Sequence, residues 1–374
     1  MTKAKKIHIG IAFNSANQSE GASVKDQYVT SQEMFAEISE TLSNLGAKVS
    51  RFEASNDFLG QLQQTWGDID LIFNLANDIY QVAVPMAVEQ ICKEKGARNL
   101  VCTGSKVEGH VLALNKVLAR RVLSNRVVQP KWCALDEITS PQADLIDFPA
   151  LVKPINEGQS IGIRQSNVVS SMNELNDVLT SLRSELGGTM LIESFLDGVE
   201  YSIGLVGNVV MPAISWDLDR LPGKPLVRGE DLKQGNLTIP HASLVEDLTI
   251  MDALAKQVIT AQLELGLQDY SRSDFRAKRS DQTPHYLETN SGPGLQNIHS
   301  VLPWTAAGAG VSYENLIGAI IAQALKRLPI ERQKELDTRG FEKAYENLIA
   351  LGKTGRSIQL AGREFYILKP LNNN

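Results

Sequence analysis

Two stretches in the last third of the chain carry acidic, amide and basic side chains at a spacing that could hold a metal ion. They are Ser271-Arg272-Ser273-Asp274-Phe275 and Tyr286-Leu287-Glu288-Thr289-Asn290, with a polar turn at residues 280–282 between them. A hairpin centred on Asp281 would place Asp274 opposite Glu288 and Arg272 opposite Asn290. Because side chains alternate across a strand, these four side chains would project from one face.

This arrangement predicts a magnesium site. Directly opposed Cβ atoms lie ~5 Å apart, so Asp274 and Glu288 would repel each other unless a cation lay between them. Carboxylate and amide oxygens are hard ligands that suit Mg²⁺, which commonly shares its shell with water and substrate phosphates. Arg272 offers a forked donor for a phosphate or a developing oxyanion. The alternative is an exposed hairpin with paired surface charges.

A lysine at the end of an earlier predicted strand adds a second phosphate-binding signal. The strand Leu151-Val152-Lys153-Pro154 is followed by a loop, residues 158–162, that contains Gly158 and Gly162. Glycines let backbone N–H groups approach phosphate oxygens, and Lys153 would supply a point charge. The chain has neither a Walker-type motif nor a strand-linked G-x-G-x-x-G, so the phosphate grip is expected to be of another kind.

The elements around these residues indicate an α/β protein that is α+β in part. Strands and helices alternate over the first ~105 residues, which favours a parallel sheet covered on both faces. A helix at 109–124, strands at 131–135 and 150–153 and a helix at 173–186 follow, and strands from 190 onward begin an antiparallel region. A helix at 313–328 is expected to end the core, with one helix and one strand in the tail.

Composition and charge narrow the class of protein. The formal net charge is −6, which gives no basic footprint for nucleic acid. Cys92, Cys102 and Cys133 lack disulfide or metal spacing and are expected to be buried reduced thiols. No apolar run approaches the ~20 residues of a membrane span, and the N-terminus is unlike a signal peptide. A cytoplasmic location is therefore expected.

Several further motifs, in a fixed order, resemble the D-alanine–D-alanine ligase family of ATP-grasp enzymes across roughly residues 5–328. The resemblance rests on Thr103-Gly104-Ser105 with Asn115-Lys116, on Leu151 to Pro154 with the glycine loop, on Ile192-Glu193-Ser194-Phe195-Leu196-Asp197-Gly198-Val199-Glu200, on Arg272-Ser273-Asp274, and on Glu288-Thr289-Asn290-Ser291-Gly292-Pro293-Gly294-Leu295. Taken singly, each lysine or glutamate is more often a solvated surface charge. Their order carries the resemblance.

The resemblance implies an ATP-grasp fold with a Rossmann-like parallel-sheet domain at 1–108, a small lid subdomain at 109–192, and an antiparallel-sheet catalytic domain at 193–328. Residues 329–374 would be an extension. It also implies small-molecule carboxylate and amine substrates, no nucleic-acid or membrane partner, and a homodimer.

The same resemblance assigns roles to individual residues. Lys116 and Lys153 would hold ATP phosphates, and Glu200 the ribose. Glu193, together with the backbone of 194–196, would read adenine. The ligands of two Mg²⁺ ions, for which Mn²⁺ could substitute, would be Asp274, Glu288 and Asn290.

Further assignments concern the reacting groups. Arg272 would stabilise the transferring phosphoryl group and the tetrahedral intermediate, and Ser160 would act from the glycine loop. Ser300 matches the position that receives the carboxylate of the second substrate. The spacing from Asn290 is one residue longer than usual, so His299 competes for that role.

Two departures from the family pattern and one open assignment bear on the substrates. Gln159 replaces the first of two paired loop serines, and the segment 226–240 has Arg228 and Lys233 but no tyrosine. The group that grips the first substrate's amine would be Glu20 or Glu33, although Glu33 could instead favour a helix dipole.

These departures predict an ADP-forming carboxylate–amine ligase, of the peptide-synthase type, whose substrates are not two D-alanines. The alternatives are D-alanine–D-alanine ligase itself, a small-molecule kinase, and a non-catalytic nucleotide-binding protein.

Overall fold

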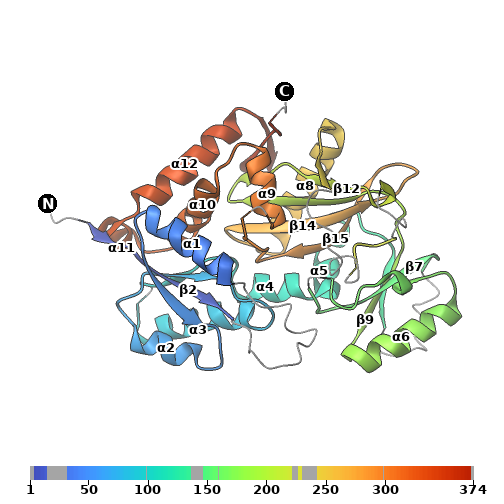
Figure 1. Ribbon diagram of the computed structural model, residues 1–374, viewed down its shortest axis with the longest axis horizontal. Helices are drawn as coiled ribbons and strands as arrows, with labels where there is room; N and C mark the ends of the chain where they lie inside the picture. Colours follow the sequence, from blue (N-terminus) through green and yellow to red (C-terminus); the bar gives the residue numbers. More distant parts are fainter. Residues whose placement is uncertain are drawn as a thin grey trace.

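The structure, a computed structural model, describes residues 4–14, 32–97, 99–135, 146–158, 160–220, 226–229, 242–297 and 299–371. Its strands form three large sheets and one two-stranded pairing. Figure 1 shows the N-terminal layer at one end, helix α6 with strands β7 and β9 at the other, and the hairpin β14–β15 between them. Within the described ranges, no helix is long and apolar enough to cross a membrane.

The N-terminal sheet is parallel, as predicted, with the strand order β3-β2-β4-β5. Alternate side chains of β2 face opposite layers, since Ile9 and Ile11 join the core cluster of α1 and Ala12 joins that of α2 and α3. The elements are β2 (His8–Phe13), α1 (Gln32–Asn44), β3 (Lys48–Glu53), α2 (Phe58–Gln64), β4 (Leu71–Asn74), α3 (Tyr80–Glu94) and β5 (Val101–Cys102). The prediction missed the short helix α2.

The expected single helix at 109–124 is wrong, because the structure breaks it into α4 (Val107–Leu114) and α5 (Lys116–Val122). Asn115 takes an extended conformation between them, and its side chain accepts hydrogen bonds from the N–H groups of Val117 and Leu118. Asn is a favoured N-cap, so it starts a new helix here. As a result Lys116 occupies the first turn of α5, where its side chain turns toward the neighbouring loop.

A second, antiparallel sheet has the order β6-β9-β7-β8 and is covered by α6. Ser171 caps α6 by accepting a hydrogen bond from the N–H of Glu174, and Gly187 with φ 70° ends it. The elements are β6 (Trp132–Leu135), β7 (Ala150–Pro154), β8 (Val168–Val169), α6 (Met172–Leu186) and β9 (Met190–Ser194). The predicted boundary at residue 192 falls inside β9, and the domain boundaries remain predictions.

The third sheet, of eight strands, carries the hairpin. Helix α8 packs against it through a row of apolar residues and was also missed by the prediction. The elements are β10 (Glu200–Val206), β11 (Val209–Val210), β12 (Ile214–Trp216), β13 (Ala242–Leu244), α8 (Leu248–Glu264), β14 (Tyr270–Ala277), β15 (Pro284–Asn290), β17 (Arg356–Leu360) and β18 (Arg363–Ile367).

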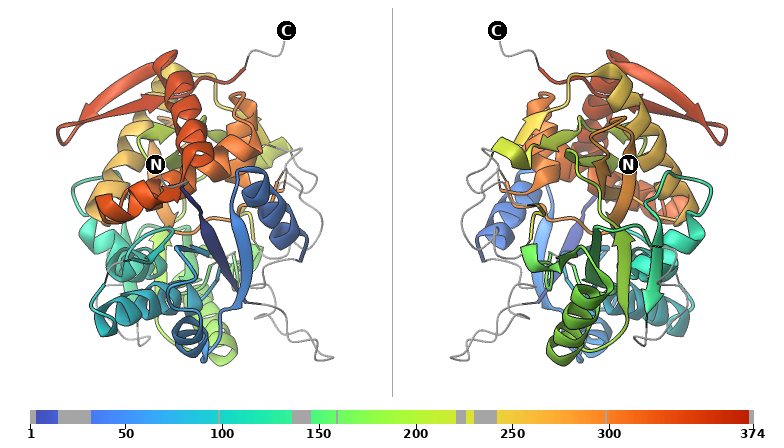
Figure 2. Two further views of the ribbon diagram at one scale, coloured as in Figure 1. Left: turned by 90° about the vertical axis from the view of Figure 1, so that its left-hand side faces the viewer. Right: turned by 90° about the vertical axis from the view of Figure 1, so that its right-hand side faces the viewer.

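The predicted end of the core at residue 328 is wrong, because the tail adds to two sheets. Strand β16 pairs with β1, and β18 pairs in parallel with β11. Phe341 and Phe365 of the tail are at most 2% exposed. Figure 2 shows the β17–β18 hairpin, in red, at the outer edge of the molecule. The remaining elements are β1 (Lys5–Lys6), α9 (Val301–Gly308), α10 (Tyr313–Leu325), α11 (Ile330–Glu335), β16 (Leu336–Asp337) and α12 (Arg339–Lys353).

The three cysteines are reduced thiols, as expected. Only Cys133 is buried, whereas Cys92 and Cys102 are half-buried, so the expectation of full burial is wrong for two of them.

Candidate active site

The hairpin that carries the predicted magnesium ligands has the predicted register. Strands β14 and β15 are antiparallel, with Asp274 paired to Glu288 and Arg272 paired to Asn290. The register shifts by one residue between Asp274 and Phe275. The bulge lies on the turn side of the four functional residues, so their shared face is preserved.

Asp274 is the most heavily bonded of these residues. Arg272 grips its carboxylate with two hydrogen bonds, Nε to Oδ1 at 3.1 Å and Nη2 to Oδ2 at 2.8 Å. Ser202 on β10 donates to Oδ1 at 2.7 Å, and the amide of Asn290 donates to Oδ2 at 3.3 Å. A cation bound at Asp274 would therefore compete with Arg272 for the same oxygens, which would free the guanidinium for a ligand.

The donor set fits a magnesium ion that shares its shell with phosphate. In the described part of the chain, no three His, Cys, Asp or Glu side chains gather as a metal-binding group. Two carboxylates and one amide do lie on one face, and Mg²⁺ is usually bound by one or two carboxylates plus water and substrate phosphates. The set is therefore incomplete for an all-protein cage but suited to a metal carried with a nucleotide.

The side chain of Lys116 lies beside Glu288. Its ammonium group is 3.4 Å from Glu288 Oε2 and donates to the carbonyl of Glu157. Its side chain is only 5% exposed. The chain thus holds a buried cation between the hairpin and the loop that follows β7, the position expected of a phosphate ligand.

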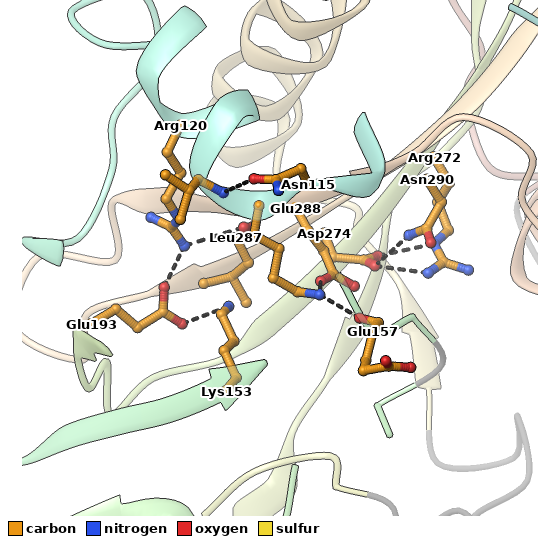
Figure 3. A network of polar contacts seen from close by, with 12 residues as sticks. Asn115, Arg120, Lys153, Glu157, Glu193, Arg272, Asp274, Leu287, Glu288 and Asn290 are labelled. Carbon is orange, nitrogen blue, oxygen red and sulfur yellow. Dashed lines mark hydrogen bonds and ion pairs between the residues drawn. The ribbon is translucent and has the colours of Figure 1, made fainter. Parts of the chain in front are cut away.

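A buried ion network joins three elements behind the hairpin (Figure 3). Glu193 on β9 lies 2.8 Å from Lys153 Nζ on β7 and also pairs with Arg120 on α5. Arg120 donates a further hydrogen bond to the carbonyl of Leu287, the residue at the hairpin bulge, at 3.1 Å. All three charged side chains are at most 3% exposed.

The charges in this network shift the pKa values of its members. Burial by itself would raise the pKa of Glu193, but attraction by Lys153 and Arg120 outweighs burial and lowers it. Burial lowers the pKa of Lys153, and Arg120 repels it, although Glu193 opposes both effects. Two cations therefore share one carboxylate, and the glutamate is held firmly in its charged form.

A narrow pocket of about 130 Å³ lies between the second and third sheets. Apolar and charged side chains line it together, a combination that suits a flat base attached to an anionic tail. The apolar side chains that line it are Leu151, Ile163, Phe195, Leu196, Val227, Leu287 and Val301.

The backbone at 194–196 presents a single unpaired donor to this pocket. The N–H of Ser194 donates to the carbonyl of Lys131 and that of Phe195 to the carbonyl of Pro149. Within the described residues, the N–H of Leu196 has no intramolecular acceptor. Of the three residues predicted to read adenine through their backbone, Leu196 is thus the one with a donor available.

Glu200 and Arg228 meet at the end of the same pocket. Arg228 Nη1 lies 3.1 Å from Glu200 Oε1, and its guanidinium lies over the ring of Trp216 at 3.7 Å. Arg228 was predicted to bind a substrate, but the structure places it on the predicted ribose ligand instead. That prediction is not supported by its position, because Arg228 lines the narrow pocket and not the larger cavity described next.

A larger cavity of about 650 Å³ lies between the N-terminal sheet and the hairpin. Arg272 and Glu288 line both this cavity and the narrow pocket, so the two spaces meet at the face of the hairpin that carries the predicted magnesium ligands. His299 and Ser300, the two competing substrate ligands, both line the cavity. Ser300 is the N-cap of α9 and accepts a hydrogen bond from the N–H of Gln296, whereas His299 is exposed.

The remaining predicted residues divide into described and undescribed ones. Ser160 lines the narrow pocket with φ 68°, a left-handed conformation that a non-glycine residue rarely adopts. Glu33 is exposed in the first turn of α1 and does not line the cavity, which favours the helix-dipole interpretation. Glu20, Lys233 and Gln159 lie outside the described residues.

Three residues of the site were missed by the sequence analysis: Arg120, His110 and Arg276. The motif Asn115-Lys116 was identified from the sequence. Arg120 follows Lys116 by about one helical turn, and this spacing is the only signal for Arg120 in the sequence. His110 on α4 is 1% exposed and its Nδ1 lies 2.8 Å from the Ser291 hydroxyl, next to Asn290. Nothing in its local sequence distinguishes it from a packed core histidine.

Burial of His110 predicts a loss of stability in mild acid. Burial lowers its pKa from 6.5 to about 4. Between pH 6.5 and pH 4, His110 is protonated in the unfolded chain but not in the folded chain, so the free energy of unfolding decreases as the pH falls. The loss is about 1.4 kcal/mol per pH unit, or roughly 3 kcal/mol in all. Urea unfolding of the wild type and His110→Gln over this range measures it; equal slopes for both proteins would contradict this assignment.

Comparison with known proteins gives a consistent result. The family model described as "D-ala D-ala ligase C-terminus" matches residues 125–322. The D-alanine–D-alanine ligase of Oleidesulfovibrio alaskensis is 30% identical over 292 residues, covering 76% of this chain and 88% of that protein. An uncharacterized protein, y4sG, of Sinorhizobium fredii is 28% identical over 265 residues, covering 69% of this chain and 75% of that protein.

Solved structures agree in fold. The crystal structure of D-alanine–D-alanine ligase from Bacillus anthracis complexed with ATP superposes with a TM-score of 0.64 and 20% sequence identity, covering 88% of this chain and 99% of that one. A second structure of the same protein gives a TM-score of 0.65.

Proposed function

Because this chain belongs to the D-alanine–D-alanine ligase family and has its ATP-grasp fold, we propose that it is an ADP-forming ligase that joins a carboxylate to an amine. The observation that carries the proposal is the junction at Arg272 and Glu288, which line both the narrow pocket and the large cavity. A nucleotide in the pocket would present its terminal phosphate to a substrate in the cavity. This geometry supports phosphoryl transfer from a nucleotide in the pocket to a substrate in the cavity.

The proposed reaction has two steps. The substrate carboxylate oxygen takes the γ-phosphoryl group of ATP, so that the P–O bond to ADP breaks and an acyl-phosphate forms. A neutral amine then attacks the acyl carbon, the C–N bond forms, and phosphate leaves. For such steps a protein contributes mainly positioning and charge neutralisation. An ion held by Asp274, Glu288 and Asn290 would supply charge neutralisation at the phosphates when bound.

Lysine and arginine side chains would neutralise the remaining negative charge of the phosphates. Lys116 lies at the junction and is positioned to hold the phosphates, and Lys153 lies deeper, on Glu193. Arg272, released from Asp274 by a cation, would donate to the transferring phosphoryl group and to the later oxyanion. Ser160 faces the same pocket. Ser300, at the start of α9, would receive the carboxylate of the second substrate with the help of the helix N-terminus.

The substrate pair is part of the proposal. The relatives named D-alanine–D-alanine ligase favour two D-alanines. Gln159 and the absence of tyrosine from 226–240 favour other amino acids or related acids. We propose the second pair, in a cytoplasmic enzyme that uses Mg²⁺, acts on small molecules and forms a homodimer.

The test is ADP and phosphate release from Mg-ATP by the purified protein with a panel of amino acids, singly and in pairs, with product masses recorded. Turnover that needs a pair, and gives a mass equal to both substrates minus water, is the expected result. Efficient formation of D-alanyl-D-alanine would overturn the substrate assignment but keep the ligase. A stable phosphorylated product from a single acid would favour a kinase.

A further inference from the structure

Arg276 is a buried cation in the narrow pocket to which no role has been assigned above. It lies on β14 two residues beyond Asp274 and pairs in register with Glu200 on β10. It is 7% exposed. It lines the narrow pocket and also a neighbouring polar pocket on the far side of Phe195.

The charges around the narrow pocket leave Arg276 without a carboxylate. Four carboxylates line the pocket, and each is ion-paired with another cation. The pairs are Glu193 with Lys153, Glu200 with Arg228, Asp274 with Arg272, and Glu288 with Lys116. Among the described residues, Arg276 has no carboxylate oxygen within 4.0 Å. Burial therefore lowers the pKa of Arg276, despite attraction by Glu200 and Glu193.

The contacts of Arg276 orient its guanidinium group. They use only part of its N–H donors. Its Nε donates to the carbonyl of Gly198 at 3.2 Å, and its guanidinium lies 4.7 Å from the centre of the Phe195 ring. A guanidinium has five N–H donors and no acceptor. The Arg276 donors are not among the buried polar atoms that lack a partner, so the remaining ones are open to the two pockets that Arg276 lines, where a ligand can supply acceptors.

The position of Arg276 identifies which part of a nucleotide it meets. It lies four residues along β14 from Arg272, a separation of roughly 13 Å at the usual rise per residue. With the triphosphate at Arg272, Arg276 lies at the opposite end of the pocket, beside Phe195 and Leu196. The groups of ATP that lie there are the base and the ribose, which are uncharged and offer neutral acceptors.

Resting on the proposed nucleotide site, we propose that Arg276 donates a hydrogen bond to a ring nitrogen of the purine, N3 or N7, and thereby positions the base. Leu196 provides a backbone donor on one edge of the base, and Arg276 provides a charged donor on another. Hydrogen bonds to a charged group are among the stronger ones in proteins. Arg276 thus binds and positions the purine base and takes no part in the chemical steps.

The experiment measures the Kd of Mg-ATP, 3-deaza-ATP and 7-deaza-ATP for the wild type and Arg276→Met by calorimetry, without amino-acid substrates. Each analogue lacks one ring nitrogen. We expect the wild type to bind one analogue at least tenfold more weakly than ATP, and Arg276→Met to bind ATP at least tenfold more weakly than the wild type does. For that analogue, the variant and the wild type should bind nearly alike.

Controls separate this role from a structural one. Arg279→Met removes an exposed arginine of the same hairpin, paired with Asp219 at 2.7 Å, and should leave all three affinities unchanged. If Arg276 only supports Phe195, Arg276→Met will weaken ATP and both analogues equally, which overturns the proposal. If Arg276→Met fails to fold, Arg276→Lys takes its place. The wild type alone also tests the proposal, because equal wild-type affinity for all three nucleotides would overturn it. A wild type that binds no nucleotide would instead refute the proposed function.

Discussion

Replacing Arg272 by Met is expected to lower kcat for ADP release about 10²-fold, the typical effect of removing one donor that stabilises a developing charge. Among the described residues, Arg272 is the cation that lines both the narrow pocket and the large cavity, and it binds the predicted metal ligand Asp274 through two hydrogen bonds. Its donors would act on charge that develops in the transition state, so kcat should fall more than nucleotide affinity does.

The apparent affinity for Mg²⁺ should behave differently from kcat in this variant. Arg272 occupies both oxygens of Asp274, so its removal takes away a competitor of the metal while Ser202 and Asn290 still orient the carboxylate. We therefore expect the Mg²⁺ concentration for half-maximal activity to stay the same or to fall.

Steady-state assays at varied ATP and Mg²⁺ measure both quantities, with Arg279→Met as the matched control. A kcat within threefold of the wild type would remove Arg272 from the reacting centre.

Replacing Glu193 by Gln is expected to cost roughly 3–5 kcal/mol in the free energy of unfolding, the usual cost of breaking a buried ion pair from one side. The glutamine keeps the size of the side chain but removes the carboxylate that Lys153 and Arg120 share. Two buried cations would then face each other without compensation. Nucleotide affinity should also fall, since Glu193 and Lys153 line the pocket.

A surface pair provides the matched control for this prediction. Glu185 pairs with Arg164 on the outside of α6, with side chains 34% and 35% exposed. Exposed pairs contribute at most ~1 kcal/mol, so Glu185→Gln should barely change the urea midpoint.

The charge count of the network gives a second comparison. Arg120→Met should cost less than Glu193→Gln, because it leaves Lys153 and Glu193 as a balanced pair. If Glu193→Gln is no less stable than Glu185→Gln, the buried network contributes little to folding.

The sequence by itself determined the features that depend on spacing within one element. Alternation along a strand places Arg272 and Asp274 on one face, and the polar turn at Asp281 sets which residues of β15 face them. The parallel N-terminal sheet followed in the same way from apolar strands separated by helical stretches. These predictions held because side-chain direction within a regular element follows from its geometry alone.

Tertiary structure decided which charges meet across elements. Arg120 and Glu193 lie 73 residues apart, and their pairing depends on how α5, which packs in the core of the third sheet, lies against β9 of the second sheet. Arg228 proved to lie on Glu200, and Arg276 forms no ion pair with any carboxylate of the described residues. The tail, which carries no motif, was found to add strands to two sheets. In each case the partner depends on packing between segments that are far apart in the sequence, and this packing cannot be predicted from the local sequence.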